Sequence, residues 1–174
     1  MQTIYRSKHE AYPFLSDPAD DLRCDFEIMT DELASMIGLL RSTIKDEKIR
    51  KDLIVICELV YHLNPSLRTF VSVTDDEYLW LENLTETLQD EVKERFEKFV
   101  LTQGGHTACQ AHVIRTKFKA LVRLLYRHAF MGHDVPERLF DFSNLLSGYF
   151  FLLALKLNAL DQIEEIEYIS RNYK

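Results

Sequence analysis

The sequence predicts an all-α protein, an up-and-down bundle of about five helices behind an irregular N-terminal arm. Turn-forming residues are scarce, with five Gly and four Pro among 174 residues, whereas a sheet-rich fold needs many tight turns. Apolar residues recur at steps of three and four along much of the chain, which is the period of a helix face. Hydrophobic residues make up 47% of the chain, so we expect one core and a single domain over residues 1–174.

The first part of the chain contains the arm and two expected helices. Residues 1–20 hold two of the four prolines and show no clear period, which predicts an irregular arm. Apolar residues on one face predict a helix over about 22–44. A second helix is expected over about 46–63, because Asn64-Pro65 stops its apolar run. Residues 66–74 favour extended structure, but the stretch is too short and isolated to predict a strand.

The rest of the chain is expected to form three more long helices and a short tail helix. Thr74, followed by three acidic residues, predicts a helix start. The apolar stripe of this helix continues through Phe99 to about residue 101, and Gly104-Gly105 supplies the expected stop. The remaining helices are predicted over about 107–130, 136–157 and, in the tail, 164–173.

The charge balance and the cysteines argue against several classes of function. The net charge is −7 and there is no dense Lys/Arg run, so no nucleic-acid partner is expected. Cys24, Cys57 and Cys109 form no CxxC pair, which indicates a reducing compartment. No apolar leader is visible, and the longest apolar run, around 149–155, is too short to cross a bilayer. We therefore expect a cytoplasmic protein with no membrane partner.

Two cations stand one turn apart on the expected helix over 107–130. Arg115 and Lys119 share a mostly apolar face with His112 and Phe118. A buried cation needs an anionic partner, which would be a phosphate or a carboxylate from another helix or subunit. Alternatively, the pair only snorkels at the edge of the bundle and keeps its charges in water.

The remaining motifs assign no reaction. His106, Cys109 and His112 lie at a spacing that zinc ligands can have, but a zinc site needs at least three well-placed ligands and Cys109 equally suits a core position. No metal site is therefore predicted. The chain contains no phosphate-binding glycine loop, dinucleotide fingerprint, nucleophile elbow or zinc-protease motif. These patterns alone indicate a helical bundle without an identified activity.

Three blocks of sequence carry a family resemblance. The central block is Phe99-Val-Leu-Thr-Gln-Gly-Gly105 followed by His112-Val-Ile-Arg-Thr116. Downstream lies Asn144-Leu-Leu-Ser-Gly-Tyr-Phe-Phe-Leu-Leu-Ala154, and upstream lie Asp20-Asp-Leu-Arg23 and Asp31-Glu-Leu-Ala-Ser-Met-Ile-Gly-Leu39. In this order, the blocks resemble the signatures of the ATP:corrinoid adenosyltransferases of the propanediol-utilisation type.

The resemblance implies a helical bundle that assembles as a homotrimer, with active sites between subunits. In such enzymes the lone pair of cobalt(I) in a reduced corrinoid attacks the 5′ carbon of ATP. Triphosphate leaves and adenosylcobalamin is formed. Cobalamin, ATP and Mg²⁺ are therefore the ligands that the resemblance implies.

The resemblance also implies roles for individual residues. Phe99 matches the aromatic residue that packs beneath the corrin and displaces its lower ligand. Arg115 matches an arginine that contacts ATP, and Asp31 matches the aspartate that pairs with this arginine across the subunit boundary. These three are the expected catalytic residues. Further residues are expected to bind the corrinoid or ATP. Four of them stand at positions that match the family, His112, Lys119, Asn144 and Ser147, and two are basic residues of the arm, Arg6 and Lys8.

The chain departs from the family pattern mainly where the family holds ATP. Lys119 replaces the family's second arginine, which keeps the charge but loses the bidentate fork. An arginine, a glutamate and an aspartate of the family are replaced by Ala120, Val122 and Gly148. The arm lacks the family's glycine-containing phosphate loop, so Arg6, Ser7 and Lys8 would have to serve in its place. Two alternatives follow: a catalytically impaired relative that binds corrinoid or acts as a trimeric carrier or assembly protein, and an unrelated bundle in which Arg115 and Asp31 only lock subunits together.

Overall fold

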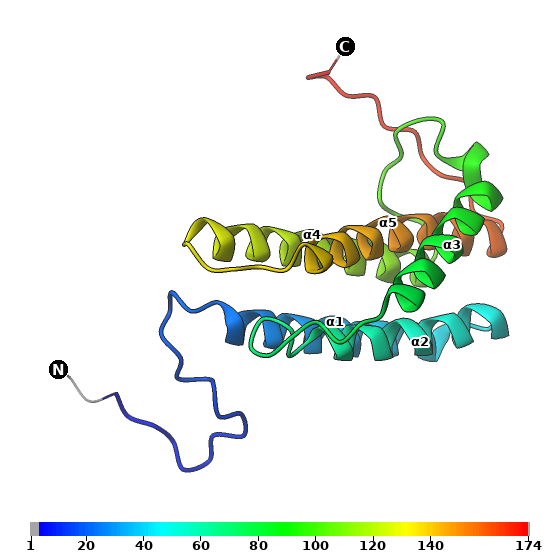
Figure 1. The fold of residues 1–174 in the computed structure, drawn as a ribbon. Helices are drawn as coiled ribbons and strands as arrows, with labels where there is room; N and C mark the ends of the chain where they lie inside the picture. Colours follow the sequence, from blue (N-terminus) through cyan, green and yellow to red (C-terminus); the bar gives the residue numbers. More distant parts are fainter. Residues whose placement is uncertain (1–3, 174) are drawn as a thin grey trace.

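The computed structural model describes residues 4–173, and helices dominate it (Figure 1). In chain order they are α1 (Arg23–Thr43), α2 (Glu47–Leu63), α3 (Asp75–Val92), the short 3-10 helix η1 (Lys93–Arg95), α4 (His106–Phe130) and α5 (Glu137–Leu160). The expected all-α class is confirmed. The bounds of α1, α2, α4 and α5 lie within a few residues of the predicted ones.

Side chains at the predicted start positions cap two of the helices. Asp46 accepts a hydrogen bond from the Ile49 backbone N–H at the start of α2. At the start of α3, Thr74 and Glu77 form a reciprocal capping box. Each cap satisfies main-chain donors that have no partner in the first helical turn. Because capping is local chemistry, the sequence located both of these helix starts to within a residue.

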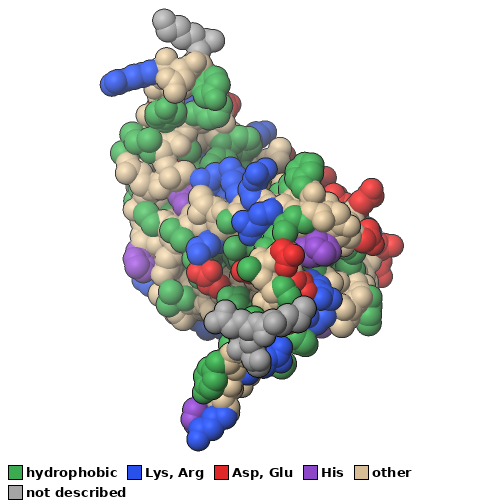
Figure 2. Space-filling model, turned by 90° about the vertical axis from the view of Figure 1, so that its left-hand side faces the viewer, with side chains coloured by type: hydrophobic (Ala, Val, Ile, Leu, Met, Phe, Trp, Pro, Cys, Tyr) green, Lys and Arg blue, Asp and Glu red, His purple; other side chains and the backbone are tan. Residues whose placement is uncertain are grey.

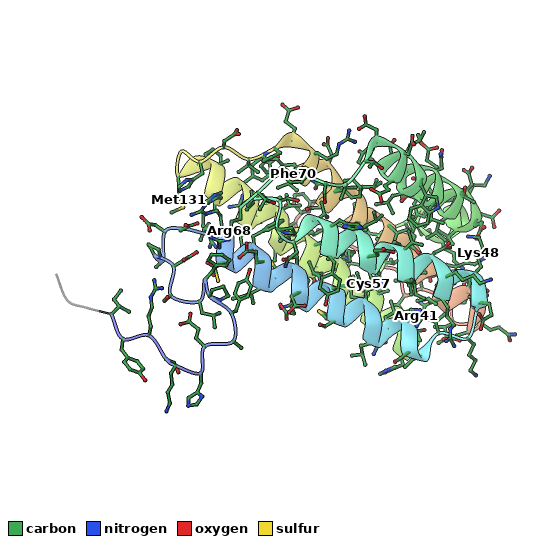
Figure 3. The ribbon with its side chains drawn as sticks, turned by 60° about the horizontal axis from the view of Figure 1, so that its bottom comes forward. Arg41, Lys48, Cys57, Arg68, Phe70 and Met131 are labelled. Carbon is green, nitrogen blue, oxygen red and sulfur yellow. The ribbon has the colours of Figure 1, made fainter. Side chains whose placement is uncertain are left out.

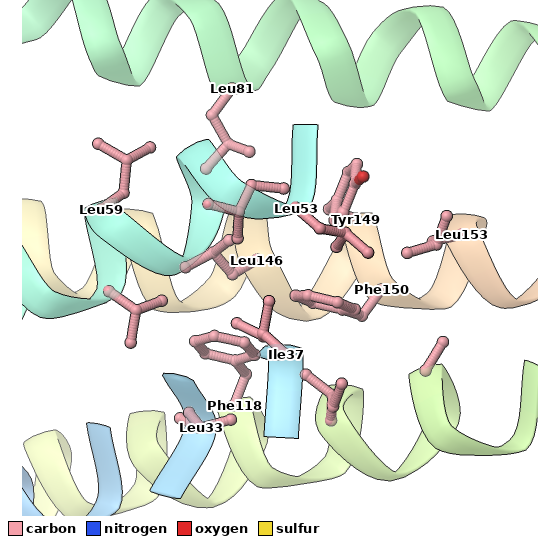
Figure 4. Packing of buried hydrophobic residues seen from close by; sticks show 14 of the residues in the cluster. Leu33, Ile37, Leu53, Leu59, Leu81, Phe118, Leu146, Tyr149, Phe150 and Leu153 are labelled. Atoms are coloured by element: carbon pink, nitrogen blue, oxygen red, sulfur yellow. The ribbon is translucent and has the colours of Figure 1, made fainter. Parts of the chain in front are cut away.

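The helices pack in two layers around one core. In Figure 1, α1 and α2 run antiparallel in one layer, α4 and α5 run antiparallel in the other, and α3 packs against α5. Figure 4 shows Phe118 of α4 and Phe150 of α5 in the middle of this core, where their rings stack with centroids 5.7 Å apart. Ile37 of α1 lies beside them and is also fully buried. The two layers are therefore joined by interlocking apolar side chains.

The apolar composition of helix α5 is explained by its burial at the centre of the bundle. By length and composition it is the one helix among the described residues that could cross a membrane, whereas the sequence prediction considered only the uninterrupted run 149–155. Leu146, Phe150 and Leu153 of α5 are completely or almost completely buried in the bundle. Packing against α3 and α4 accounts for these apolar residues.

The end of α3 and the C-terminal tail differ from the prediction. α3 ends at Val92 instead of continuing to about residue 101, and residues 164–173 form no helix. The Leu101 N–H donates to the Ile166 carbonyl over 2.8 Å, and the Tyr168 N–H donates to the Phe99 carbonyl over 2.7 Å. Main-chain bonds between the two segments thus replace helical bonds, so both helix predictions were wrong there.

The double glycine has a different role from the predicted one. Gly105 is the N-cap of α4 rather than a stop for α3, and Gly104 has a φ of +144°, which favours glycine. A Cβ on Gly104 would lie 2.0 Å from Oδ1 of Asn158 in α5. The two glycines therefore allow the loop before α4 to approach α5 closely.

The arm predicted over residues 1–20 is irregular over residues 4–20 and is anchored to the bundle, while residues 1–3 lie outside the part of the chain that the structure describes. Arg68 forms an ion pair with buried Glu27 of α1 at 2.7 Å and another with Asp17 of the arm at 3.1 Å. Its guanidinium also lies 3.5 Å from the ring centroid of Phe14. Figure 3 shows Arg68 at the end of the bundle where the arm meets the helices. The sequence reasoning did not anticipate this anchor.

Candidate functional site

A hollow of ≈ 590 Å³ lies between α4, α5 and the segment 96–102. It combines apolar and cationic side chains and is lined by Phe96, Glu97, Lys98, Phe99, Val100, Thr102, Arg115, Lys119, Ser147, Gly148 and Phe151. Four of these residues, Phe99, Arg115, Lys119 and Ser147, belong to the site expected from the sequence. The structure therefore brings together residues that are up to 48 positions apart in the chain, from Phe99 to Ser147.

Arg115 is the half-buried cation of this hollow. Its guanidinium carbon lies 5.9 Å from the ring centroid of Phe151, and its carbonyl accepts a hydrogen bond from the Ser147 hydroxyl at 3.2 Å. Its Nε is buried and has no hydrogen-bond partner among the described residues. Burial lowers the pKa of Arg115, because the charged form is removed from water. An anionic ligand in the hollow would provide the partner that this side chain lacks.

His112 lies one turn before Arg115 and is nearly enclosed. The residue is only 4% exposed, and neither ring nitrogen has a hydrogen-bond partner among residues 4–173. Its ring centroid lies 6.2 Å from that of Phe151. Burial, and then the charge of Arg115, lower the pKa of His112 to about 4. The imidazole is therefore neutral at physiological pH and adds no charge beside Arg115.

The buried imidazole predicts a pH-dependent loss of stability. The folded protein leaves His112 neutral down to about pH 4, whereas the unfolded chain protonates it below about pH 6.5. The unfolded state then binds more protons, so stability falls as the pH falls between these values. Melting temperatures over this range should fall less steeply for His112→Gln than for the wild type, while the exposed control His62→Gln keeps the wild-type slope. Equal slopes in wild type and His112→Gln would contradict the prediction.

His112 and four other expected site residues lie outside the lining of the hollow. Asp31 is exposed on α1 and accepts a hydrogen bond from the Tyr61 hydroxyl at 3.0 Å. Asn144 is exposed on α5, one turn before Ser147 and Gly148, and donates to the Phe140 carbonyl at 2.9 Å.

Arg6 and Lys8 are exposed in the arm, and the arm lies at the end of the bundle opposite the segment 96–102 (Figure 1). Figure 2 views the arm's end of the molecule, where basic, acidic and apolar side chains are interspersed. Within one chain, these two residues and Asp31 do not join the hollow.

Sequence reasoning missed two residues that shape the site. Phe151 forms part of the lining and lies near both Arg115 and His112. Its position one turn after Ser147 is the signal that could have identified it. Asn158 is completely buried and packs against the double glycine, but a lone asparagine in an apolar helix matches no motif.

The zinc alternative has no ligand set in the described part of the chain. No group of three or more His, Cys, Asp or Glu side chains within residues 4–173 could hold a metal ion. His106 is exposed on α4, whereas His112 is buried beside Arg115. The three-residue spacing therefore does not bring zinc ligands together here.

Comparison with known proteins decides the family. The family model for cobalamin adenosyltransferases matches residues 17–157. The chain belongs to this family. A corrinoid adenosyltransferase from Bacillus subtilis (strain 168) is 27% identical over 158 residues, which cover 86% of this chain and 81% of the relative. The family resemblance read from the sequence blocks is confirmed.

Solved structures agree with the cobalamin adenosyltransferase assignment. A variant PduO-type ATP:corrinoid adenosyltransferase from Lactobacillus reuteri, complexed with cobalamin and ATP, matches with a TM-score of 0.76 at 25% identity, covering 89% of this chain and 87% of that chain. Another variant of this type from the same organism, complexed with ATP, has a TM-score of 0.76 at 26% identity, covering 86% and 88% of the two chains. The bundle is thus the fold of this family.

Proposed function

We propose that this chain is a corrinoid adenosyltransferase, which transfers the 5′-deoxyadenosyl group of ATP to cob(I)alamin and produces adenosylcobalamin and triphosphate. The observation that carries the proposal is the hollow, where the exposed aromatic Phe99 and the half-buried cation Arg115 line one space. Membership of the family and the relative complexed with cobalamin and ATP support it.

The proposed reaction depends on positioning and charge rather than on an acid or a base. The lone pair of cobalt(I) forms the bond to the 5′ carbon, while the bond from that carbon to oxygen breaks and its electron pair leaves with triphosphate. Arg115 and Lys119 would bind the phosphates and stabilise the charge of the leaving group. Phe99 would pack beneath the corrin and keep the lower ligand and water away from the cobalt.

Magnesium enters this proposal only as the companion of ATP. The described residues offer no group of three acidic, His or Cys side chains for a metal ion. Phosphate oxygens and water are ligands that Mg²⁺ accepts, so ATP would bring most of the coordination with it. No step of the proposed reaction is assigned to the ion.

We also propose that the chain forms a homotrimer in the cytoplasm. A second hollow, of ≈ 290 Å³, lies between α1 and α4 and is almost wholly apolar. Exposed Leu39 and Val113 line it, and burial against another copy would remove them from water. Asp31 of α1 would then pair with the partner subunit's Arg115. The free state of all three cysteines suits a reducing compartment.

Sedimentation tests the oligomer. We expect the protein to sediment at three times the mass of one chain, the assembly that the family resemblance implies, in which a neighbouring copy would cover the apolar hollow between α1 and α4. A protein that sediments as a single chain at concentrations used for the assay would contradict the trimer.

The activity has a direct assay. The purified protein is mixed with ATP, magnesium and chemically reduced cobalamin, and the absorbance change to adenosylcobalamin is followed. Sustained conversion supports the proposal. A folded protein that produces no adenosylcobalamin would contradict it.

A corrinoid carrier is the second candidate function, and one observation favours it. A Cβ on Gly148 would meet no protein atom within 4 Å, so open space remains where the family has a carboxylate. A cobalamin titration separates the candidates. Binding without conversion indicates a carrier, and the absence of binding excludes both functions.

A further inference from the structure

Phe99 owes its position to the backbone rather than to packing of its ring. The residue is 81% exposed, so neighbouring side chains do not fix it. Its carbonyl accepts the Tyr168 N–H at 2.7 Å, and the Leu101 N–H donates to the Ile166 carbonyl at 2.8 Å. Val100 and Glu167 form an antiparallel bridge between these bonds. The segment around Phe99 and the C-terminal tail therefore form a short two-stranded ribbon.

A buried asparagine fixes the end of this segment that precedes α4. Asn158 of α5 accepts a hydrogen bond from the Gly105 N–H at 3.0 Å through Oδ1. Its Nδ2 donates to the Gln103 carbonyl at 3.1 Å and to Oε1 of Glu165 at 3.3 Å. One amide thus holds both the double-glycine turn and the tail.

An ion pair fixes the other end of the segment. Nη1 of Arg95, at the end of η1, lies 2.7 Å from Oε2 of Glu165. The same nitrogen donates to the Ile163 carbonyl of the tail at 3.0 Å. The Glu165 side chain is only 7% exposed, so these partners take the place of most of the water around its carboxylate. We name Arg95, Asn158 and Glu165 the polar clamp.

We infer that the polar clamp positions Phe99 and the outer wall of the hollow for the corrinoid. This inference rests on the proposed function. The clamp joins both ends of the Phe99 segment to the tail, whereas Arg115 and Lys119 stand on α4, outside it. Loss of the clamp should therefore disturb the corrinoid side of the site and spare the cationic side. Its three members are positioning residues, since they act through Phe99.

The decisive comparison uses Glu165→Ala, Glu165→Gln and Glu167→Ala. Glu165→Ala removes the carboxylate that joins Arg95 to the Asn158 amide and leaves them only their bonds to main-chain groups and the distant carboxylate of Glu164. Glu165→Gln retains an oxygen in its place. Glu167→Ala removes only the exposed ion pair with Lys98 on the same ribbon. Glu167 is an acidic residue of the same tail and lies outside the lining of the hollow, so this variant is the matched control. Each variant is compared with the wild type in cobalamin affinity, ATP affinity, melting temperature and hydrogen exchange of the amides over 96–103.

Glu165→Ala should weaken cobalamin binding about tenfold, the cost of a buried group that loses its partner, and should speed exchange over 96–103. ATP affinity should change less than about twofold, since the cations of α4 keep their positions. Glu165→Gln should recover part of the loss, and Glu167→Ala should behave as the wild type.

Cobalamin binding that is unchanged in Glu165→Ala would overturn the inference about the polar clamp and leave the proposed function standing. Equal losses for cobalamin and ATP, with a lowered melting temperature, would also overturn it, because they indicate general destabilisation. A wild-type protein that binds no cobalamin would overturn the proposed function and, with it, this inference.

Discussion

Replacing Arg115 with alanine should abolish measurable ATP-dependent turnover while the bundle stays folded. The guanidinium is half-buried in the hollow, and its Nε has no partner among the described residues. Its Nε is therefore available to bind an anion without first breaking an internal hydrogen bond among the described residues. Loss of a charge-assisted contact in a site that works by positioning should lower kcat/KM by about a hundredfold or more. Stability should change little, because the variant removes a poorly solvated charge.

The assay is the conversion of reduced cobalamin, measured over a range of ATP concentrations. Arg123→Ala is the matched control, since Arg123 is an exposed arginine two turns further along α4 and outside the hollow. Arg115→Lys should fall between the wild type and Arg115→Ala, because it keeps the charge without the planar fork. Wild-type kcat/KM in Arg115→Ala would remove this residue from the proposed site.

Most of the fold was predictable because its determinants are local or periodic. Asn64-Pro65 marks the end of α2, and the capping box at Thr74 marks the start of α3. The prediction failed where partners lie far apart in the chain. Phe99 continues the helical period of α3, yet its backbone pairs with Tyr168 of the tail. A periodic pattern contains no information about such a distant main-chain partner.

The candidate site was predictable to a different extent for each residue. The four-residue spacing of Arg115 and Lys119 placed both cations on one face of α4, and both line the hollow. The inclusion of Phe99 and Ser147 came from the family resemblance, since an isolated aromatic or serine indicates no chemistry. The pairing of Asp31 with Arg115 stays a prediction, because it requires a second copy of the chain.

Replacing Phe99 with alanine should separate function from stability even more sharply. The side chain is 81% exposed and makes no contribution to the core, so the free energy of unfolding should change by no more than about 0.5 kcal/mol. In the proposed reaction, the same ring occupies the space beneath the corrin. Its loss admits water or a lower ligand to the cobalt and misplaces the reacting atoms, which should slow turnover by about a hundredfold.

Phe130→Ala is the matched control for this prediction, because Phe130 is 86% exposed at the far end of α4 and does not line the hollow. Both variants should melt near the wild-type temperature, and only Phe99→Ala should lose activity. The absorbance spectrum of bound cob(II)alamin should also change in Phe99→Ala, since it reports the ligands of the cobalt. A Phe99→Ala variant with a wild-type rate and spectrum would show that the Phe99 ring does not act on the corrinoid. We expect Phe99→Ala to lose activity with unchanged ATP affinity, and Arg115→Ala to lose ATP affinity. Together, these two results would assign the Phe99 end of the hollow to the corrinoid and the Arg115 end to ATP.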